Sequence, residues 1–236
     1  MSPLPENNPG PDYRYELKFV VDPLRSEHLR HQIRLNAAAF YQAYPPRQVN
    51  NVYLDTYTLA NYENTLSGTS NRLKVRYRWY GEDEYPETGT LEIKCKRNNL
   101  GWKLMYGASC APYQTGDTWQ AFHKNLHEQF PPEGRFWIET YPQPIIINRY
   151  MREYYVSADG QVRLTLDTDQ RSYDQRYRSI PNVRNKTAIP DIAIMELKFG
   201  VGAYAEARNI LRSLPARLSS HSKYVLGLNA LSVLGI

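Results

Sequence analysis

The sequence predicts an α+β protein built on a closed antiparallel β-barrel of about eight strands, with helices at its periphery. Three observations lead to this prediction. At 236 residues the chain is long enough for one large barrel domain. Its aromatic content of 13%, with 20 tyrosines, is typical of strand-rich folds. Most of the predicted strands are joined by short hairpin connections, which link antiparallel neighbours.

The first half of the chain reads as strands interrupted by one helix. Residues 13–21 form the first expected strand. Asp22-Pro23 then predicts the start of a helix over 24–40, which Tyr44-Pro45-Pro46 ends. Residues 56–64 read as a turn-like segment. The remaining strands of this half are expected over residues 50–55, 72–78, 91–96 and 101–106.

The second half begins with a helix expected over 117–130, with Asp117 as its N-cap and Pro131-Pro132 as its stop. A tight turn at 158–160 joins two long strands. The basic segment 171–189 is expected to hold another strand and a loop. The other elements of this half are strands over 145–156, 162–168 and 192–199 and helices over 203–214 and 222–234.

Basic residues alternate with apolar ones along the strand at 72–78. Because side chains of a strand alternate between faces, one face carries Arg72, Lys74, Arg76 and Arg78. The segment alone is also consistent with an ordinary half-buried strand, whose basic row lies in water. However, charge rows of the same period recur at 14–18, 92–96, 163–167 and 196–198. Like charges crowded on one sheet face destabilise it unless an anion neutralises them. We therefore expect a basic concave surface or tunnel that holds a polyanion, with a few carboxylates left to hold a metal.

Composition narrows the classes of function. The net charge of +5 is modest, and Lys and Arg are interleaved with apolar residues rather than gathered in runs, so we expect no nucleic-acid partner. No apolar run approaches the ~20 residues of a membrane span. Residues 1–12 are expected to be a flexible leader, and 13–236 a single domain that resides in the cytoplasm by default. Cys95 and Cys110 are expected to be reduced thiols.

An ordered set of short motifs adds a resemblance to this reading. The motifs lie at residues 14–19, 52–56, 73–78, 91–94, 150–153, 162–167, 195–198 and 222–224. Together they resemble the polyphosphate polymerase domain of the vacuolar transporter chaperone (VTC) family, within the CYTH-like triphosphate tunnel metalloenzymes. The resemblance extends from residue 13 to residue 226, and it is the order of the motifs that makes it specific.

The resemblance implies an antiparallel tunnel of about eight strands that binds a linear phosphate chain. It implies phosphate ligands at Lys18, Arg76, Arg78, Lys94, Arg152, Arg163 and Lys223. Lys223, Arg76 and Arg78 would be catalytic, and Glu196 would hold Mn²⁺ or Mg²⁺. Lys103 is a weaker match, and Arg152 is preferred to Arg149 on the Tyr-x-Arg spacing.

Each of these roles has an ordinary structural alternative. Glu196 could merely pair with Lys198, and Lys223 could be a solvated surface lysine. The remaining acidic residues of the rows, Glu16, Glu92 and Asp167, are expected to be salt-bridge partners of their basic neighbours; the alternative is that one of them joins the metal.

The function implied is a nucleotide-dependent polyphosphate polymerase that acts on polyphosphate and nucleoside triphosphate. The alternatives are a hydrolase of tripolyphosphate or organic triphosphates and a non-catalytic polyphosphate-binding module. Arg14 replaces the first carboxylate of the Glu-x-Glu-x-Lys motif of related hydrolases and cyclases, which argues against simple hydrolysis. Because free release of polymer into the cytosol would be harmful, we expect a separate membrane partner that holds the protein at the inner face of a membrane.

Overall fold

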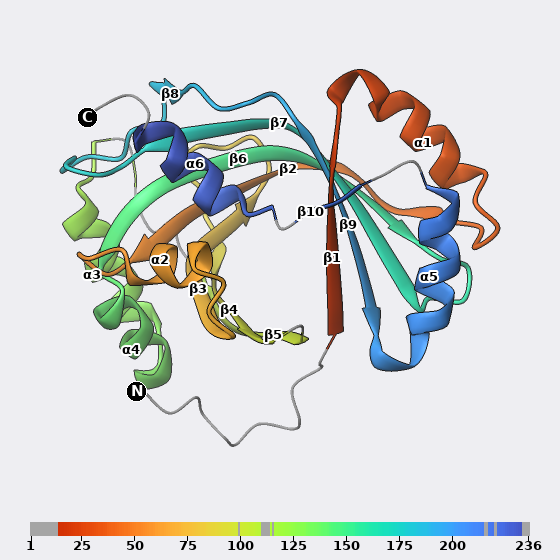
Figure 1. Cartoon of the computed structure of the whole chain (residues 1–236). Helices are drawn as coiled ribbons and strands as arrows, with labels where there is room; N and C mark the ends of the chain where they lie inside the picture. The colour runs from red at the N-terminus through yellow and green to blue at the C-terminus, as the bar shows by residue number, and fades with distance from the viewer. Residues whose placement is uncertain are drawn as a thin grey trace.

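Ten strands form one antiparallel sheet that closes on itself in the part of the chain that the computed structural model describes, residues 14–98, 100–109, 114, 116–214, 217–219 and 221–232. Figure 1 shows their arrangement. The strands are β1 (Arg14–Val21), β2 (Tyr41–Asp55), β3 (Asn71–Tyr80), β4 (Gly89–Arg97), β5 (Leu100–Ala108), β6 (Gln143–Val156), β7 (Val162–Asp174), β8 (Lys186–Thr187), β9 (Ala193–Gly200) and β10 (Arg217–Ser219). The leader expected over 1–12 and Cys110 lie outside the described residues.

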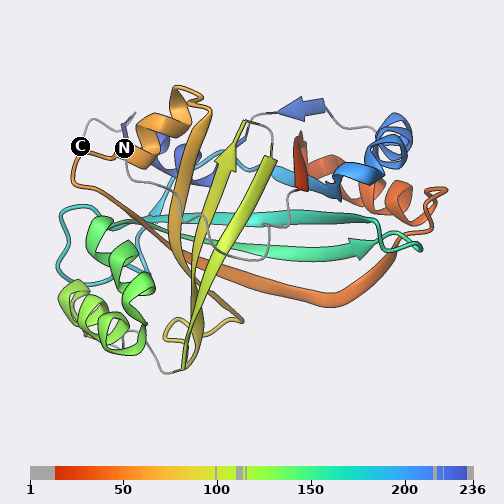
Figure 2. The same ribbon diagram turned by 90° about the horizontal axis from the view of Figure 1, so that it is seen from below.

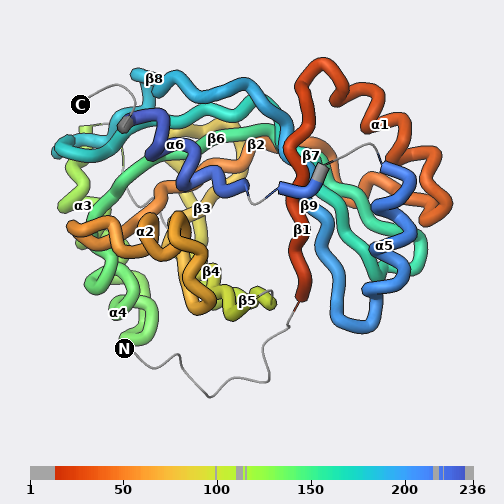
Figure 3. The backbone as a smooth tube through the Cα atoms, viewed as in Figure 1, coloured from red at the N-terminus to blue at the C-terminus, as the bar shows by residue number. Residues whose placement is uncertain are grey.

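The sheet closes because β9 pairs with β1 on one side and with β7 on the other. The resulting ring of eight strands runs β1-β5-β4-β3-β2-β6-β7-β9, and the short strands β8 and β10 attach to β7 and β1. The contact between β1 and β5 is the shortest in the ring, with Arg14 opposite Gly101 as its one registered pair. Figure 3 shows β1 beside β9, with β5 approaching from the other side. The predicted α+β fold with a closed antiparallel sheet is confirmed.

Six helices lie around the ring in the same described ranges. They are α1 (Ser26–Arg34), α2 (Ala60–Leu66), α3 (Trp119–Gln129), α4 (Pro132–Thr140), α5 (Tyr204–Ser213) and α6 (Lys223–Ser232), with short 3₁₀ turns at Pro23–Arg25 and Val201–Ala203. Figure 2 shows α3 and α4 at one end of the molecule and α1 and α5 at the other. None of these helices is long and apolar enough to cross a bilayer.

The apolar core lies on the outer face of the ring, between the strands and the helices. Val75, Tyr77 and Trp79 of β3 belong to a buried cluster with Phe122 of α3 and Trp137 of α4. A second cluster joins the outer faces of β1, β7 and β9 to α1 and α5. Because fully burying such side chains contributes about 1.5–3 kcal/mol each, the outward rows fix the register of the strands. The charged rows must then face inward.

Strand β2 differs most from its prediction. The helix expected over 24–40 ends at Arg34, and β2 already begins at Tyr41, so it includes Pro45 and Pro46. Proline lacks a backbone donor and is tolerated at sheet edges and bulges. Here β2 pairs with β6 alone until Val49, and its register shifts just before the two prolines and again across them, between Tyr44 and Arg47. The prolines therefore lie where β2 has a free edge.

Three helix assignments also required the tertiary structure. Helix α3 begins at Trp119 and is capped by the Thr118 side chain, which accepts from the Ala121 N–H at 3.2 Å, so the prediction of Asp117 as the cap is wrong. The 56–64 segment contains the start of α2, and α4 begins at Pro132, directly after α3. Helix α2 is capped from a distance, because Asp55 accepts from the Asn61 N–H at 2.9 Å.

Candidate functional site

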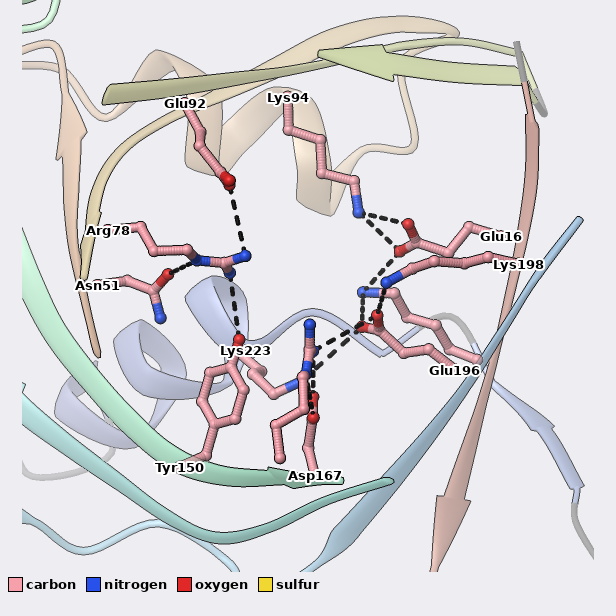
Figure 4. Close-up of polar contacts among 12 residues, drawn as sticks. Glu16, Asn51, Arg78, Glu92, Lys94, Tyr150, Asp167, Glu196, Lys198 and Lys223 are labelled. Carbon is pink, nitrogen blue, oxygen red and sulfur yellow. Dashed lines mark hydrogen bonds and ion pairs between the residues drawn. The ribbon is translucent and has the colours of Figure 1, made fainter. Parts of the chain in front are cut away.

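The inward faces of the strands enclose a cavity of about 1530 Å³ that is lined with charge. The close-up in Figure 4 shows side chains from β1, β3, β4, β6, β7, β9 and α6 pointing toward one another across this space. The basic side chains that line it are Arg14, Lys18, Arg72, Lys74, Arg76, Arg78, Lys94, Lys96, Lys103, Arg152, Arg163, Lys198 and Lys223. The lining carboxylates are Glu16, Glu92 and Glu196. These thirteen basic side chains outnumber the three lining carboxylates and the buried carboxylate of Asp167, so the cavity has a positive potential.

Asp167 on β7 is fully buried in the wall and anchors two of the cations. Its carboxylate oxygens accept from Arg152 Nε and Nη2, each at 2.6 Å, and from Lys223 Nζ at 2.6 Å. Burial raises the pKa of Asp167, but Arg152 and Lys223 outweigh it and hold that pKa below its ordinary value. The carboxylate is therefore ionised at neutral pH, and the predicted salt-bridge role of Asp167 is confirmed.

Lys223 reaches these partners because α6 packs closely against β6 and β7. A Cβ atom at Gly227 would lie 2.8 Å from both Ile146 Cδ1 on β6 and Ser172 Oγ on β7, so any larger residue there would have to displace these side chains. Lys223 is the first residue of the helix, is 7% exposed and lies 4.7 Å over the ring of Tyr150. The alternative that Lys223 is a solvated surface lysine is thus excluded.

Glu196 on β9 is surrounded by cations. Its oxygens lie 2.9 Å from Lys198 Nζ, 3.2 Å from Lys18 Nζ, 3.6 Å from Arg152 Nη2 and 3.8 Å from Lys223 Nζ. Burial raises the pKa of Glu196, but Lys198 and Lys18 lead a larger opposing effect that holds it well below its ordinary value. Glu196 does pair with Lys198, and it also holds three other cations toward the cavity.

A second group of ion pairs lies across the cavity on β3, β4 and β5. Glu92 accepts from Arg76 at 2.6 Å and lies 3.5 Å from both Arg78 Nη1 and Lys103 Nζ. Arg78 also donates to Asn51 Oδ1 at 2.8 Å and to the Tyr150 hydroxyl at 3.2 Å. Both guanidinium groups are therefore held in fixed orientations toward the cavity.

Glu16 on β1 joins the two groups. It accepts from Lys94 Nζ at 2.6 and 2.8 Å and lies 3.4 Å from Lys18 Nζ. Burial lowers the pKa of Lys94 to about 8 despite this partner. Lys74 has no carboxylate partner among the described residues and donates to Ser222 Oγ at 2.8 Å. Burial and the repulsion of Lys18 hold the pKa of Lys74 well below its ordinary value.

The capacity of this site for a metal is limited by its own charges. In the described ranges no three His, Cys, Asp or Glu side chains converge on one point. Glu196 offers hard oxygen donors to the cavity, but four cations surround it. Mg²⁺ is commonly bound by one or two carboxylates together with substrate phosphates and water. The donor set thus fits a divalent ion that arrives with a phosphate chain, whose charge offsets the lysines and arginines.

The structure places the predicted ligands unequally. Lys18, Arg76, Arg78, Lys94, Arg152 and Lys223 all converge on the cavity and on its carboxylates. Arg163 also lines the cavity, but it is exposed and forms no ion pair with any described residue. Arg149 lies on the opposite face of β6 and pairs with Glu84, as alternation requires. Tyr77 packs in the outer core.

Sequence reasoning missed several inward residues. The motifs identify Lys198 only as a partner of Glu196, and they do not include Lys74 among the phosphate ligands although it belongs to the basic row. Tyr53 and Tyr150 are buried, and their hydroxyls accept hydrogen bonds from Arg76 at 3.3 Å and from Arg78 at 3.2 Å. Their even spacing from other inward residues was a usable signal.

The fold and this cavity define the protein as a closed-sheet, basic-channel domain suited to a chain of anions. Comparison with protein families identifies it further, because residues 13–232 match the VTC domain. The chain belongs to the VTC domain family. A comparison with curated proteins finds no match.

Two solved structures are similar to this chain. One is a "putative adenylate cyclase" from Vibrio parahaemolyticus, 10% identical, with 94% of this chain and 99% of that chain covered and a TM-score of 0.54. The other is the PH1819 protein from Pyrococcus horikoshii OT3, 14% identical, with 92% and 98% covered and a TM-score of 0.49. The likeness to the Vibrio protein concerns the fold alone.

Proposed function

We propose that this protein is a metal-dependent phosphoryl transferase of the polyphosphate polymerase type, which binds inorganic polyphosphate and nucleoside triphosphate in its cavity. The observation that carries the proposal is the thirteen basic side chains facing three carboxylates inside a closed ring of strands. Such a surplus requires a ligand of high charge density. Enclosure favours a narrow linear anion, and this supports a phosphate chain over a nucleic acid.

In this proposal the arginines hold phosphate oxygens in their planar forks and the lysines act as point charges. Arg76, Arg78 and Lys223 are the residues that would contact the reacting phosphates. Phosphoryl transfer depends chiefly on positioning and on neutralising charge. The carboxylates of Glu92 and Asp167 already fix the orientation of these three cations before any substrate enters. Incoming phosphates would share these cations with the two carboxylates.

Mn²⁺ or Mg²⁺ would be held by Glu196 together with phosphate oxygens. When bound, such an ion would stabilise negative charge that develops on the transferred group. Lys198 and Lys18, which contact Glu196 in the free protein, would then turn to the phosphate chain. We further propose a cytoplasmic location beside a separate membrane partner, because polymer released freely into the cytosol would be harmful.

One observation favours a second candidate, a polyphosphate-binding module without turnover. Among the described residues no three His, Cys, Asp or Glu side chains gather into a metal site, and Arg14 lines the cavity where related hydrolases carry a carboxylate. A site with so few metal donors could retain a phosphate chain without transferring phosphoryl groups. The same scarcity counts against a hydrolase of tripolyphosphate or organic triphosphates.

The test is incubation of the purified protein with ATP and Mn²⁺, with polymer detected on a gel and binding of tripolyphosphate measured by calorimetry. We expect polymer from the unaltered protein and none from Glu196→Ala. Glu128→Ala is the matched control, since Glu128 is exposed and pairs only at 3.9 Å with Lys124. Circular dichroism of each variant separates loss of activity from loss of fold.

The outcomes distinguish the candidates. Tight binding of tripolyphosphate without polymer, under any nucleotide or metal, would support the binding module and reject the polymerase. Release of phosphate from tripolyphosphate without polymer would identify a hydrolase. Failure to bind tripolyphosphate at all would reject every function assigned to this cavity.

A further inference from the structure

Aromatic side chains gather at one end of the cavity, beside its charged lining. Tyr44 of β2, Tyr80 of β3 and Tyr154 of β6 all line the cavity. Tyr44 lies opposite Tyr154 in the β2–β6 register, and their rings meet edge to face with centroids 5.7 Å apart. Tyr44 is 57% exposed and Tyr80 is 45% exposed. Large parts of these ring surfaces are therefore open.

Arg47 lies at the centre of this group. Its guanidinium carbon is 4.1 Å from the ring centroid of Tyr80, 5.0 Å from that of Tyr154 and 5.7 Å from that of Tyr44. Its Nε donates to the Tyr154 hydroxyl at 3.2 Å, and it forms no ion pair with any described residue. The planar cation thus orders the three rings without a carboxylate.

The aromatic group directly adjoins the proposed phosphate channel. Tyr154 and Arg152 are successive inward residues of β6, and Tyr80 and Arg78 are successive inward residues of β3. Arg47 lies opposite Arg152 in the register of β2 and β6. Two residues along a strand span about 7 Å. A planar group stacked on the rings would therefore be separated from phosphates held by Arg78 and Arg152 by about the length of one ribose.

We propose that Tyr44, Tyr80 and Tyr154, ordered by Arg47, form a stacking site for the base of a nucleoside triphosphate whose phosphates extend into the channel. This inference rests on the proposed function, and it separates nucleotides from inorganic polyphosphate as ligands. Stacking on an aromatic ring accepts any base, because every base has a π-face. The base then sits at the ring group, and the terminal phosphate reaches deepest among the cations.

The test compares the dissociation constants of ATP and of inorganic tripolyphosphate, each measured by calorimetry without added metal. In Tyr80→Ala the affinity for ATP should fall about tenfold, in the range of one lost base stack, while the affinity for tripolyphosphate stays constant. Tyr80→Phe should keep the affinity for ATP, since stacking requires the ring and not the hydroxyl. Tyr57→Ala is the matched control, because Tyr57 is 78% exposed and follows the opposite end of β2.

Each other outcome overturns the inference. If Tyr80→Ala lowers the affinities for ATP and tripolyphosphate equally, the ring supports the channel and does not bind a base. If it weakens neither, the rings are not used for the nucleotide. These two results leave the proposed phosphate channel intact, because tripolyphosphate still binds the unaltered protein. Absence of tripolyphosphate binding to the unaltered protein would instead reject the channel, and the base site with it.

Discussion

Replacing Asp167 by asparagine tests whether the buried charges of the channel are held in place for a ligand. Asp167 is fully buried and forms hydrogen bonds of 2.6 Å with Arg152 and Lys223. Asp167→Asn keeps the shape and removes the charge, which leaves two cations with Glu196 as their nearest carboxylate, at 3.6 and 3.8 Å. Breaking a buried ion pair in this way costs about 3–5 kcal/mol. For a chain of this size that lowers Tm by roughly 6–20 °C.

The matched control lies two residues further along β7. Asp169 pairs with Arg171 at 2.6 Å, but the two side chains are 52% and 38% exposed. Exposed pairs contribute about 0–1 kcal/mol, so Asp169→Asn should change Tm by a few degrees at most. Asparagine also tolerates the left-handed backbone at this position, where φ is 49°.

Ligand should reverse much of the loss. A polyanion that binds the folded state at 100 times its dissociation constant adds about 2.7 kcal/mol of stability. In Asp167→Asn the freed cations should bind tripolyphosphate more tightly, so the gap in Tm between the variant and the unaltered protein should narrow as tripolyphosphate is added. Thermal unfolding with and without tripolyphosphate measures this. A gap that stays constant or widens, or a loss no greater than that of Asp169→Asn, would refute the reasoning.

Three further predictions concern other parts of the structure. The pKa of Lys94 is lowered to about 8, so Lys94 is charged below that pH and becomes neutral above it. The affinity for tripolyphosphate, measured by calorimetry, should therefore fall between pH 7 and 9.5. Lys94→Arg should make this fall smaller. Gly227→Ala should lower Tm and weaken tripolyphosphate binding, because its Cβ would meet Ile146 at 2.8 Å, whereas Gly202→Ala meets nothing within 4 Å and should change neither. Burial raises the pKa of the Cys95 thiol to about 12; peptide mass spectrometry should find Cys95 alkylated at pH 8 only after denaturation, and labelling of the native protein would contradict its burial.

Local sequence signals were sufficient where strands are flanked by clear turns. The turn at 158–160 ends in Gly160, whose φ is 73°. It joins β6 and β7 in the predicted hairpin. The signals failed where a distant residue supplies the stabilising contact. Asp55 caps α2 across six residues and also accepts from the Tyr224 hydroxyl of α6 at 2.5 Å. No window of sequence around 56–64 contains that information.

The same division holds for the site. Alternation along β3 and β9 assigned Arg76, Arg78 and Glu196 to one side of each strand from sequence alone. Which side faces inward depends on α3, α4 and α5, whose apolar faces cover the other side. The pairing of Asp167 on β7 with Lys223 on α6 joins residues 56 positions apart. Such pairs follow from chain closure and not from spacing.

By itself, the sequence determined the period of the charged rows, the α+β class and the set of basic residues available to a phosphate chain. The tertiary structure alone decided that β9 closes the ring between β1 and β7, which cations each carboxylate holds, and where the tyrosines of the cavity end meet Arg47. The physical reason is that alternation is a local property of an extended backbone. Closure, burial and charge pairing instead depend on contacts between segments far apart in the chain.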